Sequence, residues 1–129
     1  MKSLKEIILE KLKIGSKTKV ITYSCHPKDK NELIDIIKER LDKDKDANLN
    51  DIDVSKIIDM SKLFKGLKPH NIDISEWDVS NVETMDDMFY NCDKFNCDLS
   101  KWDVSNVENM NYMFGGCKSL KNKPSWYKE

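Results

Sequence analysis

Two stretches of this chain are nearly identical and lie 25 residues apart. WDVSNVETMDDMF begins at Trp77, and WDVSNVENMNYMF begins at Trp102. A degenerate earlier copy lacks the tryptophan, but the Asp-Val-Ser triplet recurs at Asp53, Asp78 and Asp103. A fixed period of about 20–50 residues is typical of solenoids, in which each unit buries its apolar face against the next. The sequence therefore predicts a stack of about three 25-residue units.

Each unit carries the signals of a short strand followed by a short helix. Cys97 and Leu99 alternate with polar residues, which is typical of a strand. Ser80 and Glu83 match the Ser-x-x-Glu capping box, and Ser105 opens a second copy, so a helix is expected to begin at each serine. Stacking would place the strands in a parallel sheet and bury the recurring apolar positions. These predicted core residues are Met60, Phe64, Trp77, Val82, Met85, Met88, Phe89, Cys92, Trp102, Val107, Met110, Met113, Phe114 and Cys117.

The segment FNCDLSKWDVSNVENMNYMF resembles the bacterial surface-antigen, or BspA-like, type of leucine-rich repeat, in its subgroup of unknown function. The resemblance covers about residues 50–120. It implies a right-handed solenoid and a family without known catalytic residues. The expected fold class is therefore an α/β solenoid, a short leucine-rich-repeat-like, right-handed stack of about three 25-residue strand–helix units with an N-terminal strand–helix cap.

The two ends of the stack are expected to be covered, with the whole chain forming one folded unit. Residues 1–49 would form the N-terminal cap, and residues 50–129 the repeats with a C-terminal flap. Within the cap, residues 2–13 are amphipathic and favour a helix, whereas residues 18–25 favour a strand. The flap is predicted in KNKPSWYKE, at residues 121–129.

A further helix is expected to follow the cap strand. Asp29 has the residue type and the position of an N-cap. Apolar residues then recur on one helical face, at Leu33, Ile36, Ile37 and Leu41. This strand and helix would together cover the apolar end of the first unit.

The charge of the chain is nearly balanced overall, at −1, but it is unevenly distributed. Residues 1–50 hold 12 Lys and Arg against 9 Asp and Glu, whereas residues 51–129 hold 10 against 14. The apolar run Ile7-Ile8-Leu9 is too short for an export signal, and no stretch is apolar enough to span a bilayer. The sequence predicts a cytoplasmic protein without membrane insertion.

Patterns of catalytic and metal-ligating residues are weak in this sequence. No Cys-x-x-Cys pair or zinc spacing occurs among Cys25, Cys92, Cys97 and Cys117, so buried thiols are favoured over ligands. In an oxidising compartment the same cysteines could pair. Cys25 and His26 are neighbours on the expected strand and would point to opposite faces, which disfavours a thiolate pair. We expect no metal, no cofactor and no enzymatic activity.

The repeated aspartates raise a separate question about cation binding. Stacking would bring the carboxylates of Asp53, Asp78 and Asp103 close together, where they would repel one another. A divalent cation could offset the repulsion. Hydrogen bonds from the backbone in an Asx-turn could do the same, and the Asp-x-Ser context favours this second interpretation.

Repetition favours recognition over catalysis, because identical units build a rigid face whereas a reaction needs a unique set of groups. We therefore expect a non-enzymatic protein-binding module. The outward positions that differ between units are the predicted partner-binding residues. They are Glu76, Thr84, Asp86, Asp87, Tyr90, Lys101, Asn109, Asn111 and Tyr112.

The expected partner is a bacterial host protein or nucleoprotein complex. One hypothesis is an inhibitor, encoded by a phage or other mobile element, that blocks a host defence protein. Its acidic residues 51–129 would then imitate nucleic acid or dock on a basic groove. Two alternatives remain: a fragment or small member of a surface adhesion protein, and a nucleic-acid binder that uses the basic residues 1–30. The oligomeric state is left open.

Overall fold

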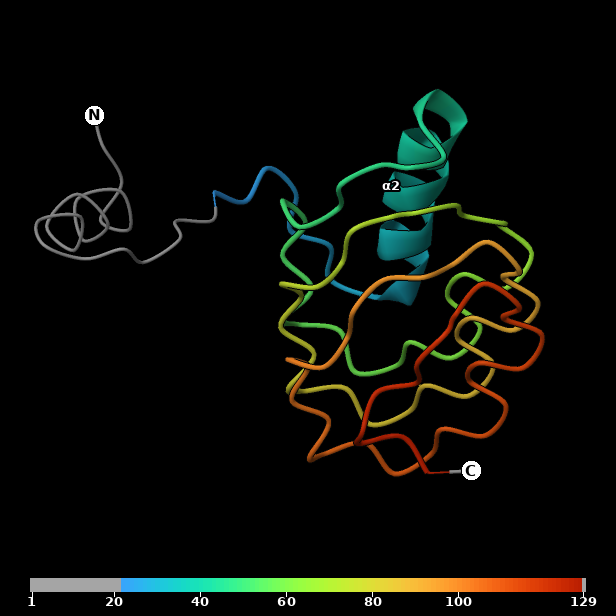
Figure 1. The fold of residues 1–129 in the computed structure, drawn as a ribbon. Helices are drawn as coiled ribbons and strands as arrows, with labels where there is room; N and C mark the ends of the chain where they lie inside the picture. The colour runs from blue at the N-terminus through green and yellow to red at the C-terminus, as the bar shows by residue number, and fades with distance from the viewer. Residues whose placement is uncertain (1–21, 129) are drawn as a thin grey trace, which may run out of the picture.

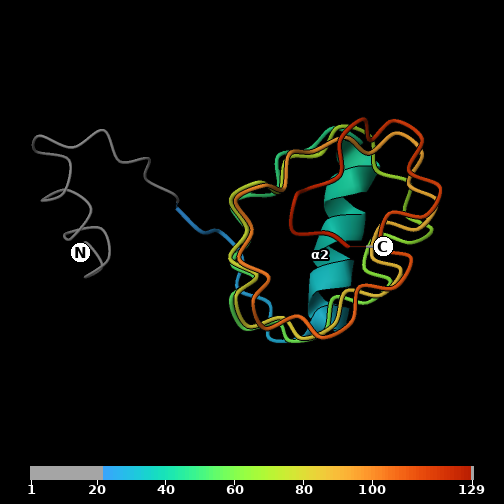
Figure 2. The same ribbon diagram turned by 60° about the horizontal axis from the view of Figure 1, so that its bottom comes forward.

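The structure is a computed structural model that describes residues 22–128. The chain winds into coils that lie one above another (Figure 1). Seen along the stack, the coils overlay as a single ring (Figure 2). We number the coils by their Asp-Val-Ser triplets, so that the first begins at Asp53, the second at Asp78 and the third at Asp103.

One helix is present between residues 22 and 128, α2 (Lys30–Lys43), and it crosses the ring in Figure 2. It begins after Asp29, as predicted, and the Asp29 carboxylate accepts a hydrogen bond from the Glu32 N–H at 2.9 Å. Leu33, Ile37 and Leu41 are buried in the same core as the coils. The apolar face of α2 therefore covers the end of the stack that precedes the first coil.

An ion pair ties α2 to the segment that leads into the first coil. The Arg40 guanidinium donates to both carboxylate oxygens of Asp51, at 2.9 and 2.7 Å. These bonds hold the pKa of Asp51 at about 2, below its ordinary value of 3.8. Asp51 therefore remains ionised, and the tie remains intact, well into the acid range.

Main-chain hydrogen bonds join each coil to the next in a 25-residue register. Parallel bridges link Asp59 to Thr84 and Thr84 to Asn109. The Met60 N–H donates to the Thr84 carbonyl at 2.9 Å, and the Met85 N–H donates to the Asn109 carbonyl at 2.8 Å. The same exchange therefore repeats at both junctions between numbered coils.

Aromatic rings form two columns inside the stack. Phe89 stacks between Phe64 and Phe114, with ring centroids 5.3 and 5.6 Å away. Trp77 and Trp102 stack at 6.4 Å, with their rings only 7° from parallel. Of the predicted core residues, 11 are buried, and the three that are only partly buried are Val107, Met110 and Cys117.

The short helices that the capping boxes predict are turns in the structure, so this expectation was wrong. The Ser80 hydroxyl donates to the Asp78 carboxylate at 2.6 Å instead of capping a helix. The Glu83 N–H donates to the Ile58 carbonyl of the preceding coil at 2.8 Å. Bonds between coils thus take up main-chain groups that a helix would need. In place of the predicted strands, residues 22–128 contain isolated bridges.

Two predicted elements near the N-terminus fall wholly or in part outside the described residues: the helix at residues 2–13, and the first half of the strand at residues 18–25. In the described part of that strand, Cys25 forms a parallel bridge with Ile52. As for membrane association, no helix within residues 22–128 combines the length and apolar character needed to cross a bilayer.

The last described residues turn inward beneath the ring (Figure 2). Trp126 stacks on Trp102 at 6.3 Å, and its indole N–H donates to the Leu99 carbonyl at 2.9 Å. Tyr127 packs edge-on against Phe114 at 4.9 Å. The C-terminal segment therefore covers Trp102 and Phe114, but it leaves Val107 and Met110 partly exposed.

Candidate protein-binding surface

Seven of the nine predicted partner-binding residues lie together on the second and third coils. Thr84 and Asn109 form a bridge, the Asp86 carboxylate accepts from the Asn111 N–H at 2.8 Å, and the Asp87 N–H donates to the Asn111 carbonyl at 2.9 Å. We call this set the outer face. It consists of Thr84, Asp86, Asp87, Tyr90, Asn109, Asn111 and Tyr112.

The other two predicted residues form a separate pair beside the tryptophan column. The Lys101 ammonium lies 3.8 Å from the Glu76 carboxylate. The side chain of Lys101 is 76% exposed, so water screens the attraction between these charges. Glu76 and Lys101 are therefore not placed in the outer face.

The two tyrosines of the outer face have different surroundings. Tyr90 is half-buried, because Lys65 lies 5.0 Å from its ring centroid and Gly115 packs against its edge. Tyr112 is 72% exposed, and its backbone has a φ of 56°, in the left-handed region that disfavours bulky residues. Exposed tyrosines are frequent anchors of protein interfaces. Tyr112 is therefore more available to a partner than Tyr90.

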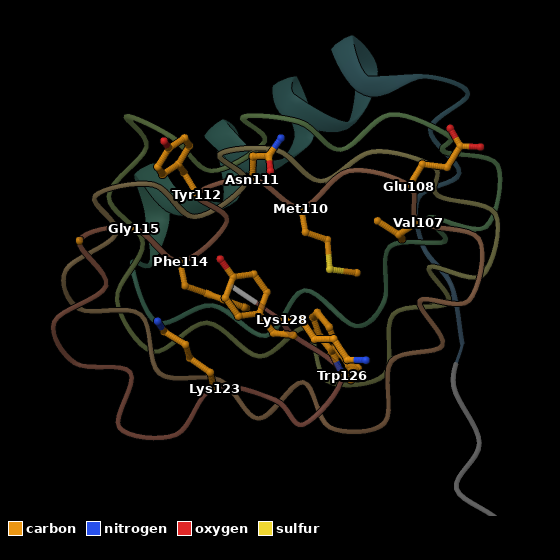
Figure 3. Close-up of a pocket in the computed structure, with 12 residues that line it drawn as sticks. Val107, Glu108, Met110, Asn111, Tyr112, Phe114, Gly115, Lys123, Trp126 and Lys128 are labelled. Carbon is orange, nitrogen blue, oxygen red and sulfur yellow. The ribbon is translucent and has the colours of Figure 1, made fainter.

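A second feature, which we call the open end, lies on the side of the third coil that the C-terminal segment covers only in part. It is an open hollow of about 1060 Å³, lined partly by apolar residues. In Figure 3, Met110, Phe114 and Trp126 point toward the middle of the ring, whereas Asn111 and Tyr112 stand on the rim. The open end therefore adjoins the outer face.

Sequence reasoning placed Val107 and Met110 in the core and so missed the open end. They are the same residue types as the buried Val82 and Met85. The copies differ only in the coil to which they belong. The available signal was that the third coil is the last to carry the full Asp-Val-Ser motif. Within residues 22–128, its lower side is covered in part by Trp126 and Tyr127, and no further coil packs there.

Residues 35–128 match the model of a protein family described as "Mycoplasma protein of unknown function, DUF285". The chain belongs to this DUF285 family. The match spans most of α2 and all three numbered coils. In the other comparisons, neither a curated protein nor a solved structure matches the chain. DUF285 membership thus identifies the family of the coils without naming an activity.

In this DUF285 protein the repeated aspartates form Asx-turns. The N–H groups of Ser55, Ser80 and Ser105 donate to the aspartate two residues earlier, at 3.0, 3.1 and 3.1 Å. The serine hydroxyls add a second bond, and that of Ser105 is the main cause that lowers the pKa of Asp103. Within residues 22–128, no group of three or more His, Cys, Asp or Glu side chains could hold a metal ion.

The cysteines of the DUF285 chain are free thiols. Burial raises the pKa of Cys92 to about 12 and that of Cys117 to about 11, so both carry a proton at neutral pH. Cys25 lies 3.6 Å from the Arg40 guanidinium, whereas the His26 ring lies 3.2 Å from the Asp53 carboxylate. Cys25 and His26 thus turn to different partners and do not form a thiolate pair.

Proposed function

We propose that this DUF285 protein is a non-enzymatic protein-binding module built on a short, right-handed solenoid of the BspA-like leucine-rich-repeat type. The 25-residue register of the main-chain bonds and the stacked rings support the solenoid. One observation carries the binding proposal. Tyr112 holds a large ring 72% exposed, on a backbone position that disfavours it.

The equivalent positions in the other coils show which residue types otherwise adopt this left-handed backbone conformation. Lys62 and Asp87 occupy it with φ values of 60° and 55°, and both carry charged side chains that water can solvate. A left-handed conformation costs an ordinary residue about 1–2 kcal/mol. At Tyr112 the exposed ring recovers little of this cost by packing. Contact with a partner would bury the ring and account for its presence.

The charge of the outer face fits a basic partner. Asp86 and Asp87 lie beside Tyr112, and residues 51–129 carry 10 basic against 14 acidic residues. We keep the hypothesis that the partner is a bacterial host protein. In its narrower form, this chain is a phage-encoded inhibitor that blocks a host defence protein. The nucleic-acid alternative relies on residues 1–30, most of which lie outside the described part.

Replacing Tyr112 by glycine is expected to stabilise the protein and to abolish partner binding. Glycine adopts a positive φ without strain, so the free energy of unfolding should rise by about 0.5–1 kcal/mol. Urea denaturation measures this change, and capture of bacterial proteins on the immobilised chain, read by mass spectrometry, measures binding.

Lys62→Gly is the matched control, since it relieves the same backbone conformation outside the outer face. It should raise stability similarly while retaining the captured protein. The proposal fails if wild type captures no specific protein, or if Tyr112→Gly retains the partner as well as Lys62→Gly does.

A further inference from the structure

Each numbered coil offers a row of main-chain donors to the coil that follows. Between the second and third coils, the donors and acceptors are 2.7–2.9 Å apart. The donors are the N–H groups of Met85, Asp87, Phe89 and Asn91, and the acceptors are the carbonyls of Asn109, Asn111, Met113 and Gly115. The edge of each coil is therefore complete only when another stretch of backbone brings carbonyls to it.

The same row recurs at the open end. The 25-residue register places its donors at Met110, Tyr112, Phe114 and Gly116. Within residues 22–128, these four N–H groups find no acceptor. Val107 and Met110 beside them are only partly buried, although their copies Val82 and Met85 are fully buried by the third coil. The third coil pairs the N–H groups and buries the apolar side chains of the second coil. The corresponding N–H groups and side chains of the third coil remain available.

We propose that the open end binds a polypeptide segment of another protein, which takes the place of a further coil. Its carbonyls accept from the donor row, and its apolar side chains fill the hollow of about 1060 Å³ beneath Val107 and Met110. This inference goes beyond the proposed function, because it concerns the open end that adjoins the outer face and stands even if the exposed side chains of the outer face bind nothing.

The structure disfavours a second copy of the chain as the occupant. A head-to-tail arrangement would need the free edge of a first coil, but α2 covers that end. There, the Lys30 ammonium donates hydrogen bonds to the carbonyl of Ser61, at 3.3 Å, and to the Asp59 carboxylate, at 3.0 Å. Two open ends facing each other would set one donor row against another. An incoming segment that offers carbonyls avoids both conflicts.

The third coil itself indicates which residues the segment should carry. Residues 103–116 (DVSNVENMNYMFGG) already pack against the lower edge of the second coil. That edge has Met85 and Phe89 at the positions where the open end has Met110 and Phe114. A synthetic peptide of this sequence offers carbonyls and apolar side chains at the required spacing. It is therefore a defined probe for the open end.

The test titrates this peptide into the isotope-labelled 129-residue chain and follows the backbone amide signals by NMR. The largest shifts are expected at the donor row of the open end, and the amides of Met85 and Phe89 should stay unchanged. A scrambled peptide of the same composition should bind at least tenfold more weakly. Because the shifts are mapped on the wild-type chain, this reading depends on no variant.

Two variants sharpen the test. Met110→Glu places a charge in the hollow and should weaken peptide binding at least tenfold. Ile58→Glu changes an apolar side chain that is 55% exposed and does not line the hollow, and it should leave binding unchanged. The proposal is overturned if the peptide shifts no amide of the donor row, or binds no better than the scrambled one. It is also overturned if the chain dimerises through this row, because the occupant is then a second copy.

The two proposals can fail separately. Met110→Glu leaves the exposed side chains of the outer face in place, and Tyr112→Gly leaves the donor row and Met110 in place. A loss of captured partner in Tyr112→Gly, with no peptide binding at the donor row of the wild-type chain, would support the outer face alone. Peptide binding at the open end without any captured partner would support only the further inference.

Discussion

Replacing Phe89 by alanine is expected to lower the free energy of unfolding by about 3–5 kcal/mol. Phe89 is fully buried, and its ring stacks on Phe95 at 4.1 Å as well as on Phe64 and Phe114 in the adjacent coils. Removing the ring leaves a cavity that these neighbours only partly fill. Since small domains have a total stability of about 5–15 kcal/mol, much of the population should unfold under mild denaturation.

Urea denaturation followed by circular dichroism measures the effect. Phe89→Leu is the matched control, because leucine keeps most of the apolar volume, and it should cost clearly less than the alanine variant. A cost below about 1 kcal/mol for Phe89→Ala would contradict the burial of this ring between two coils.

Replacing Trp102 by alanine is expected to cost about 3–5 kcal/mol, for two separable reasons. The indole ring stacks between Trp77 and Trp126, at 6.4 and 6.3 Å. Its N–H also donates to the buried carbonyl of Ile74 at 3.0 Å. Trp102→Phe keeps an aromatic ring but leaves that carbonyl unpaired, so it should cost about 1–3 kcal/mol.

Trp126→Ala provides the comparison within the same column. Trp126 is only half-buried and makes the equivalent bond to Leu99 at the uncovered side of the stack. Its replacement should therefore cost less than that of Trp102 in the same denaturation experiment. Equal losses at both tryptophans would show that the third coil is covered as completely as the second.

The repeat in the sequence was sufficient to identify most of the buried column. Met85 and Phe89 could be placed because their copies recur in register and because their spacing put them on one side of each unit. The helix after Asp29 was also predictable, since a local cap and a local apolar face specify it. These features depend on residues that are close together or regularly spaced in sequence.

Features that depend on the neighbouring coil were not predictable in the same way. Ser80 and Glu83 fit a capping box, but Ser80 bonds to Asp78 and Glu83 bonds across to Ile58, which replaces a helix by turns. Met110 and Met85 are the same residue type at equivalent positions, although only Met85 has a coil beneath it. A single unit of sequence does not record whether another unit follows it in space.

The grouping of the seven outer-face residues followed from their register, whereas the open end was not predicted from the sequence. Thr84 and Asn109 were expected to be outward-facing, and the structure places them side by side. Tyr90 and Tyr112 were both expected to contact a partner, yet Gly115 and Lys65 lie against the ring of Tyr90. The difference arises because Tyr112 occupies the position of Asp87, not that of Tyr90, in the 25-residue register.

Native-state amide hydrogen exchange most directly tests whether each coil is held by the one that follows it, with the third coil left open. The amides of Met85, Asp87 and Phe89 donate to the third coil and should exchange slowly. Those of Met110 and Tyr112, their copies at the open end, should exchange much faster in the same chain. Equal protection of the two rows would contradict the open end, and rapid exchange in both rows would contradict the stack itself.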